Sequence, residues 1–132
     1  MRDILFDSHA ILKFYQDEDG ADDVEKLLIS SRDGDLMSYI SEINLGEVYY
    51  KIIRRLGLAA ARDHLEQFSE LPIRVLPPSS DIILSASEIK AEYAISYADC
   101  FAVATAINAD ASIVTGDPEF KKVAHLVEIV WI

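Results

Sequence analysis

Residues 96–117, SYADCFAVATAINADASIVTGD, determine the fold class of this chain. The first part has the length of a helix and is apolar on nearly every side from Cys100 to Ala104, which predicts a buried helix over residues 96–110. A short apolar strand over residues 112–115 follows at once. A buried helix that leads directly into a short apolar strand is typical of a parallel sheet covered by helices.

The rest of the chain continues this alternation of short apolar runs and longer helical patterns. Strands are predicted at residues 4–6, 36–40, 73–76 and 127–132. Helices are predicted at residues 10–15, 21–30, 42–56, 58–71, 80–93 and 118–124. Ser41 and Gly57 are the expected N-cap and end of the helix between them. We therefore expect an α/β domain whose mostly parallel sheet is covered on both faces.

Size and composition limit the class of protein further. The 132 residues suit one domain, expected over residues 1–132, and a hydrophobic share of 51% argues against disorder. The single cysteine, Cys100, excludes an intramolecular disulfide and suits a reducing cytoplasm. The opening MRDILFDSH is unlike a signal peptide, and no apolar run is long enough for a membrane span. We expect a cytoplasmic protein with no membrane contact.

Four carboxylates fall where this topology places binding sites. Asp7 directly follows the first strand, and Asp117 follows the strand at 112–115. Asp99 is in the first turn of its helix and Glu47 in the second turn of another. Ligands of parallel sheets bind at the carboxyl ends of the strands, and the crossover helices begin at that same edge. All four side chains are therefore predicted at one edge of the sheet.

Two of these aspartates also have a simple structural interpretation. Asp117 precedes Pro118, so it is a good helix N-cap with proline at the first helical position. Taken alone, the sequence around Asp117 favours the interpretation as a helix cap. Asp7 or its neighbour Ser8 is a candidate cap for the next helix, and for Asp7 the structural and functional interpretations are evenly balanced.

Asp99 and Glu47 have structural alternatives as well. Asp99 follows Ser96 by three residues, as in a capping box. Because its helix is buried, however, a carboxylate there needs a partner or a cation, which favours a functional role. Glu47 has the spacing to pair with Lys51 on the helix surface. Ile43 shares the face of Glu47, which indicates that another molecule or another part of the fold covers it.

Carboxylates brought together repel one another, and a divalent cation removes that cost. Oxygen ligands suit Mg²⁺ or Mn²⁺ and not zinc. A carboxylate cluster holding Mg²⁺ is the usual apparatus for phosphodiester chemistry, because the metal polarises the phosphate and lowers the pKa of the attacking water. The residues thus predict a metal site for phosphodiester chemistry at Asp7, Glu47, Asp99 and Asp117.

The formal net charge of −11 works against a simple nucleic-acid binder. A metal-loaded site or a local basic patch would offset part of it, and the acidity could attract a basic partner protein. The densest basic stretch contains Lys51, Arg54, Arg55 and Arg62. A solvated helix surface is the simpler interpretation of each residue, whereas as a group they are candidates for contacts with RNA phosphates beside Glu47.

Four segments of the sequence resemble the PIN-domain family, and within it the VapC-type toxins of prokaryotic toxin–antitoxin pairs. ILFDSHAIL resembles the family's opening strand with the first acidic residue, here Asp7. ISEINLGEVYY resembles the segment whose helix carries the second acidic residue, here Glu47. ISYADCFAVATA resembles the segment with the third, Asp99. IVTGDPEF resembles the strand end with the fourth, Asp117, and Thr115 as a polar neighbour. The four segments occur in order across nearly the whole chain.

The resemblance implies a three-layer α/β/α sandwich, Mg²⁺ or Mn²⁺ dependence and endoribonuclease activity. It also implies a homodimer and inhibition by a cognate antitoxin protein. The RNA target does not follow from it, since toxins of this kind cleave transfer, ribosomal or messenger RNA. PIN domains also serve in RNA processing, and some are inactive.

Two other classes of function are weighed against a nuclease. A non-catalytic binding module would use the same scaffold to engage a partner chain, and Ile43, Tyr50 and the acidic charge favour it. A phosphatase or a phosphate-accepting receiver domain would also place an Asp after the first strand. A dehalogenase-type phosphatase needs a second Asp two residues later, where His9 stands, and the acidic pair and Lys-Pro context of a receiver are absent.

Overall fold

A parallel sheet forms the centre of the molecule. The computed structural model describes residues 2–132, and Met1, the first residue of the predicted domain, lies outside them. Five strands lie in the order β3-β2-β1-β4-β5, and every neighbouring pair is parallel. They are β1 (Ile4–Phe6), β2 (Ser38–Ser41), β3 (Arg74–Leu76), β4 (Ser112–Thr115) and β5 (Ile129–Trp131). The predicted α/β class is confirmed, and within residues 2–132 the sheet is parallel throughout.

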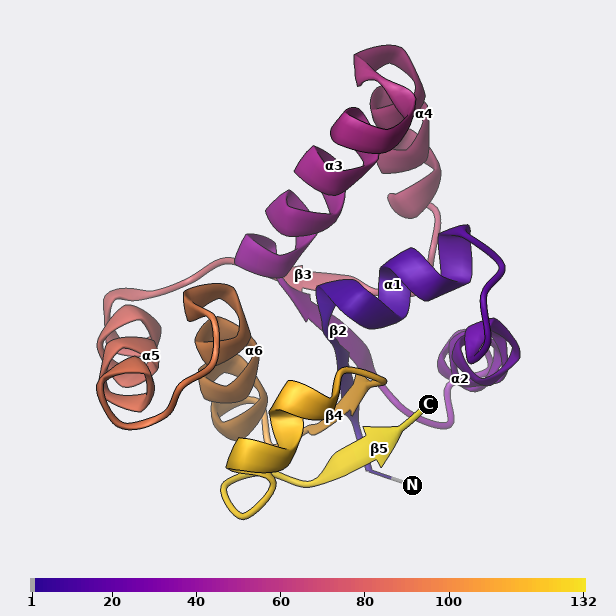
Figure 1. Cartoon of the computed structure of the whole chain (residues 1–132). Helices are drawn as coiled ribbons and strands as arrows, with labels where there is room; N and C mark the ends of the chain where they lie inside the picture. Colours follow the sequence, from indigo (N-terminus) through magenta and orange to yellow (C-terminus); the bar gives the residue numbers. More distant parts are fainter. Residues whose placement is uncertain (1) are drawn as a thin grey trace.

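Helices cover both faces of this sheet. They are α1 (Ser8–Tyr15), α2 (Ala21–Arg32), α3 (Glu42–Leu56), α4 (Leu58–Phe68), α5 (Ser80–Glu92), α6 (Tyr97–Asn108) and the 3₁₀-helix η1 (Pro118–Val123). In Figure 1, α5 and α6 lie on one side of the sheet and α1 and α2 on the other. This is the expected three-layer α/β/α arrangement. Within residues 2–132, no helix has both the length and the apolar character that a membrane crossing requires.

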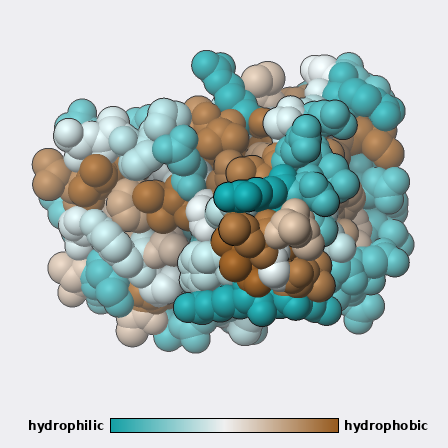
Figure 2. Space-filling model, turned by 90° about the horizontal axis from the view of Figure 1, so that it is seen from above, coloured by the Kyte–Doolittle hydropathy of each residue, from teal (hydrophilic) through white to brown (hydrophobic). Residues whose placement is uncertain are grey.

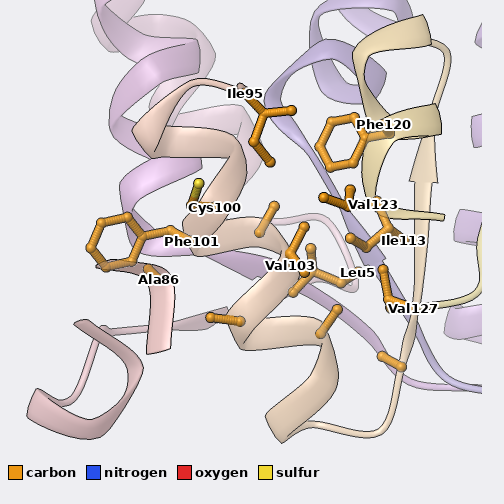
Figure 3. Packing of buried hydrophobic residues seen from close by; sticks show 14 of the residues in the cluster. Leu5, Ala86, Ile95, Cys100, Phe101, Val103, Ile113, Phe120, Val123 and Val127 are labelled. Carbon is orange, nitrogen blue, oxygen red and sulfur yellow. The ribbon is translucent and has the colours of Figure 1, made fainter. Parts of the chain in front are cut away.

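The buried helix α6 packs one face of the sheet. Every residue from Cys100 to Ala106 is buried, as the apolar sequence predicts. Figure 3 shows Val103 of α6 close to Leu5 and Ile113 of the sheet, with Phe120 and Val123 of η1 completing the cluster. Full burial of side chains of this size is worth about 1.5–3 kcal/mol each. This layer therefore holds the first turn of α6, with Asp99, rigidly against the sheet.

The other face of the sheet packs against α1 to α4. Side chains alternate along β1, so that Ile4 and Phe6 join Val114 in this second cluster while Leu5 joins the first. Strands that are buried on both faces are apolar at successive positions, without a clear alternation of polar and apolar residues, and the sequence of β1 has this pattern. The central strand β1 thus links the two cores, and the residue that follows it, Asp7, is placed by both.

Helices α3 and α4 form a hairpin that projects from the body of the molecule (Figure 1). Gly57, with φ 92° and ψ 165°, ends α3 as predicted. Leu56 and Leu58 at the tip are 55% and 45% exposed. Figure 2 looks at the molecule from this end and shows hydrophobic side chains bordered by strongly hydrophilic ones.

Several predicted ends of helices and strands are shifted. Helix α4 ends at Phe68, three residues before the predicted end, where the chain turns and the backbone N–H of Leu71 donates to the carbonyl oxygen of Phe68. Strand β2 begins at Ser38, where pairing with Ile4 starts, and not at residue 36. The predicted helix at 118–124 is a 3₁₀-helix. These differences do not change which helices carry Glu47 and Asp99, or which strands precede Asp7 and Asp117.

The two glycines of the α3 segment should respond oppositely to alanine. Gly57 adopts a conformation that side chains disfavour, so Gly57→Ala is expected to lower the free energy of unfolding by about 1–3 kcal/mol. Gly46 lies within the helix with open space where a Cβ would go, so Gly46→Ala should raise it by about 0.5–1 kcal/mol. Urea unfolding of both variants measures the difference, and a stabilising Gly57→Ala would contradict this account of the turn.

Candidate functional site

The four predicted carboxylates surround a single pocket. Asp7 follows β1, Asp117 follows β4, Glu47 lies on the second turn of α3 and Asp99 on the first turn of α6. The pocket has a volume of about 380 Å³, and Lys51 also lines it. Parallel strands end at the same edge of the sheet, where the crossover helices begin, so residues far apart in sequence meet there.

Asp7 is the most buried of the four, with an exposed fraction of 1%. Its Oδ1 accepts a hydrogen bond of 2.8 Å from the backbone N–H of Ala10, which makes Asp7 the N-cap of α1. Its Oδ2 accepts one of 2.5 Å from the Thr115 hydroxyl. Asp7 therefore caps a helix and also lines the pocket, so the two interpretations of this residue are compatible.

Thr115 connects two of the carboxylate segments. While its hydroxyl donates to Asp7, the same oxygen accepts a 3.0 Å hydrogen bond from the backbone N–H of Asp117. Asp117 in turn caps η1 by accepting from the backbone N–H of Glu119 at 2.9 Å. The fully buried Thr115 thus fixes the end of β4 relative to the end of β1.

Glu47 is held by two neighbours. Its Oε1 accepts a hydrogen bond of 2.5 Å from the hydroxyl of Ser8, and its Oε2 lies 3.8 Å from the Nζ of Lys51. The predicted ion pair with Lys51 is therefore present. The side chain of Glu47 is only 14% exposed, so this part of α3 is not plain solvent surface.

Asp99 starts the buried helix and carries half of the expected capping box. The Ser96 hydroxyl accepts a hydrogen bond of 3.1 Å from the backbone N–H of Asp99 and is the N-cap of α6. In a complete capping box the acidic side chain would reach back to the backbone of the cap. Here the Asp99 carboxylate lines the pocket.

Burial and mutual repulsion disturb the acidity of the site. Burial raises the pKa of Asp7 to about 7, against the lowering effect of its hydrogen bonds, and the charges of Asp99 and Asp117 raise it further. Burial also raises the pKa of Asp99 to about 6, with a contribution from Glu47. Ionising Asp7 and Asp99 is thus costly for the protein alone, and a bound cation would offset that cost.

A hard divalent cation fits this donor set in chemistry and charge, since all four side chains offer carboxylate oxygens. The side chains are not arranged as a finished metal shell, because among residues 2–132 no three His, Cys, Asp or Glu groups lie close enough to hold an ion. Several of the oxygens are occupied locally, as those of Asp7 show. Binding a cation therefore requires side-chain movements around the pocket.

The predicted basic contacts divide into two groups. Lys51 lines the acidic pocket, beside Glu47. Arg54 lies one turn further along α3, with its guanidinium 5.0 Å from the centre of the Tyr50 ring. Arg55 borders a different, smaller pocket between α1, α3 and α4, away from the carboxylates.

Two residues that line the pocket, Ser8 and Glu119, are not among the predicted site residues, whereas His9 was a candidate for substrate contact from its place near Asp7, with a structural role as the simpler interpretation. Ser8 was considered only as an alternative helix cap, and its contact with Glu47 joins α1 to α3 across 39 residues. Glu119 adds a fifth carboxylate to the rim and pairs with Lys122 at 2.7 Å. His9 also lines the pocket, and its Nδ1 is buried with no hydrogen-bond partner. The proximity of Ser8 and His9 to Asp7 was the available signal.

Comparison with known proteins gives the class to which this architecture belongs. The model of the PIN domain family matches residues 4–126. The chain therefore belongs to the PIN domain family. No curated protein matches the sequence.

Solved structures share this fold at low sequence identity. A chain of the VapBC2 complex from Rickettsia felis, bound to a promoter DNA fragment, superposes with a TM-score of 0.78 at 16% identity, with 98% of each chain covered. VapC20 of Mycobacterium tuberculosis, a toxin that cleaves the sarcin-ricin loop, gives 0.72 at 20% identity over 89% of this chain and 92% of that one. A chain of FitAcB from Neisseria gonorrhoeae gives 0.70 at 20%, covering 96% and 95%.

The raised pKa of Asp7 predicts how metal-free protein responds to pH. The folded state holds a proton on Asp7 up to about pH 7, whereas the unfolded chain releases it near the ordinary value of 3.8. Stability without metal should therefore fall as pH rises from 4 to 7, by about 4 kcal/mol from this group as an upper figure. Asp7→Asn should remove this loss and make the protein more stable than wild type at pH 8 in EDTA.

Thermal unfolding in EDTA between pH 5 and pH 8 measures this effect. Excess Mn²⁺ should raise the melting temperature of the wild type at pH 8 and that of Asp7→Asn much less. Asp22→Asn, at an exposed position of α2, is the matched control and should behave as wild type. Equal pH profiles for wild type and Asp7→Asn would contradict the assigned environment of Asp7.

Proposed function

We propose that this protein is a metal-dependent endoribonuclease, the toxin component of a type II toxin–antitoxin system, and that residues 1–132 form its single nuclease domain. The observation that carries the proposal is the meeting of Asp7, Glu47, Asp99 and Asp117 at one pocket from four separate elements. Membership of the PIN domain family and the fold shared with VapC20 support it.

In this proposal Asp7, Asp99 and Asp117 hold a Mg²⁺ or Mn²⁺ ion, and Glu47 completes the shell directly or through water. When bound, the cation would polarise the scissile phosphate, lower the pKa of the attacking water and neutralise the leaving oxygen. The protein supplies no nucleophile of its own. Its carboxylates orient the water and the phosphate, and Thr115 keeps Asp7 and Asp117 in a constant relation through its two hydrogen bonds.

Phosphate must approach a pocket of negative charge, so cations of the protein should guide it. Lys51 is the best placed, because it lines the pocket and is only partly engaged, 3.8 Å from Glu47. Arg54 lies further along the same face of α3 and would contact a phosphate next along the strand. Arg55, facing another pocket, contributes to the same field at longer range.

The proposed toxin acts in the cytoplasm, where its RNA substrate is, as a homodimer held inactive by a cognate antitoxin. The chains it resembles in fold include members of VapBC and FitAB complexes, which supports an antitoxin partner. The net charge of −11 suits a partner with basic segments. A small open reading frame just upstream of the gene would support this assignment.

A non-catalytic binding module is the second candidate. It is favoured by one observation, that no three ligand groups among residues 2–132 are close enough to hold an ion. Exposed Ile43 and Tyr50 beside Glu47 would then contact a partner chain. This alternative predicts weak or no binding of Mn²⁺, which calorimetry on the wild type measures directly.

Cleavage of total RNA by purified protein tests the nuclease. With Mn²⁺ or Mg²⁺ we expect discrete fragments that disappear in EDTA and with Asp99→Asn, because the cation loses a ligand at the centre of the site. The surface variant Asp22→Asn should cleave as wild type. Full metal-dependent cleavage by folded Asp99→Asn would contradict the site, and absence of cleavage by folded, partner-free wild type would favour the binding module.

Lys51 should affect RNA binding separately from chemistry. In the Asp99→Asn background, the further change Lys51→Gln is expected to weaken binding of a labelled single-stranded RNA and to lower the salt slope by about 0.7–1, the value of one phosphate contact. Fluorescence anisotropy at several salt concentrations measures this slope. Lys26→Gln on α2 is the control, and an unchanged slope for Lys51→Gln would exclude Lys51 as a phosphate contact.

A further inference from the structure

Glu47 needs an external restraint to act as a ligand. It lies on the second turn of α3, near the end of the helix that adjoins the sheet in Figure 1, and reaches the pocket through a long side chain. Ordering a glutamate side chain costs up to about 2 kcal/mol of conformational entropy. The other acidic residues lie directly after strands or at the start of α6, which is buried from Cys100 to Ala106, so their positions are set largely by the backbone.

The Ser8 hydroxyl provides that restraint. Ser8 is 4% exposed, and its Oγ donates a hydrogen bond of 2.5 Å to Glu47 Oε1. Lys51 lies near the other oxygen, Oε2, but at 3.8 Å and on an exposed side chain it restrains Glu47 less. Of these two contacts, only the Ser8 bond joins Glu47 to the segment that carries Asp7.

Two features indicate that this bond is not a by-product of helix capping or burial. Serine at the start of a helix usually serves as its cap, but here Asp7 has that role and the Ser8 hydroxyl is free for Glu47. Burial alone does not create such a bond either, because Ser38 is 1% exposed and its hydroxyl has no partner. Ser8 is thus directed at Glu47 specifically.

We propose that Ser8 is a positioning residue of the metal site, which sets Glu47 relative to Asp7 by joining α3 to the start of α1. This inference rests on the proposed function. The bond occupies Oε1 and leaves Oε2, 3.8 Å from the Nζ of Lys51, as the oxygen that Glu47 would contribute to the cation or its water. Without this bond the Glu47 side chain would be less restrained, although all four carboxylate residues would still be present.

Calorimetric titration with Mn²⁺ tests the proposal without relying on activity. Ser8→Ala is expected to weaken Mn²⁺ binding by at least tenfold, as the loss of a group that orients a metal ligand typically does. Ser38→Ala is the matched control, since it removes an equally buried hydroxyl without a hydrogen bond, and should bind Mn²⁺ as wild type. Ser8→Thr keeps the hydroxyl and should restore most of the affinity.

Dependence of RNA cleavage on Mn²⁺ concentration gives a second measure. Ser8→Ala should need about tenfold more Mn²⁺ for half-maximal cleavage, with the rate recovering at saturation, whereas a general loss of folded protein would lower the maximal rate. In the Glu47→Gln background, Ser8→Ala should have little further effect on Mn²⁺ affinity.

Two outcomes would overturn the inference in distinguishable ways. If wild type binds Mn²⁺ and cleaves RNA, but Ser8→Ala matches Ser38→Ala in affinity, Ser8 has no positioning role and the proposed function stands. If folded wild type neither binds Mn²⁺ nor cleaves RNA, the proposed function and this inference fail together.

Discussion

The burial of Asp7 between two hydrophobic cores is the constraint on which the rest of the site depends. Its carboxylate directly follows the central strand and is almost inaccessible to water, so each oxygen needs a partner. One bond comes from the first turn of α1 and the other from Thr115 at the end of β4. The Thr115 bond therefore joins the ends of β1 and β4, and the Ala10 bond joins the end of β1 to α1.

In the metal-free protein, ionising the buried Asp7 lowers the stability of the fold. Hydrogen bonds lower the pKa of Asp7, yet burial and neighbouring carboxylates outweigh them. Evolution of a stable fold alone would favour a neutral residue at such a position. A bound cation would neutralise such a cluster. The unfavourable free energy of the buried carboxylates would then be relieved on binding, which adds to the affinity for the metal.

Much of the fold and the four acidic positions could be predicted from the sequence, because both follow from short-range patterns. The apolar run of α6 and the strand before Asp117 specify a helix and a strand locally, and parallel topology then brings their ends to one edge. Helix ends were less predictable, as the early end of α4 shows. The end of a helix depends on how the chain turns against its neighbours, and propensity does not encode this.

The contacts around the carboxylates could not be predicted in the same way. Ser8 pairs with Glu47 across 39 residues, and the identity of its partner depends on the distance between α1 and α3, which only tertiary packing sets. The basic residues show the same limit, because Arg55 follows Lys51 by four residues on α3, yet Lys51 lines the acidic pocket and Arg55 borders another one. Periodicity gives the direction of a side chain, but not what lies opposite it.

The balance of charge along α3 links these contacts to substrate selection. Glu47 faces the pocket, Lys51 follows one turn later and Arg54 follows beyond it, so the face changes from acidic to basic within a few residues. A metal ion would be drawn to the first part and a polyanion to the second. In the proposed nuclease, the net charge of −11 would disfavour contacts with RNA away from this basic part of α3. The acidity that argues against a general nucleic-acid binder is therefore compatible with the proposed contact of RNA at this face of α3.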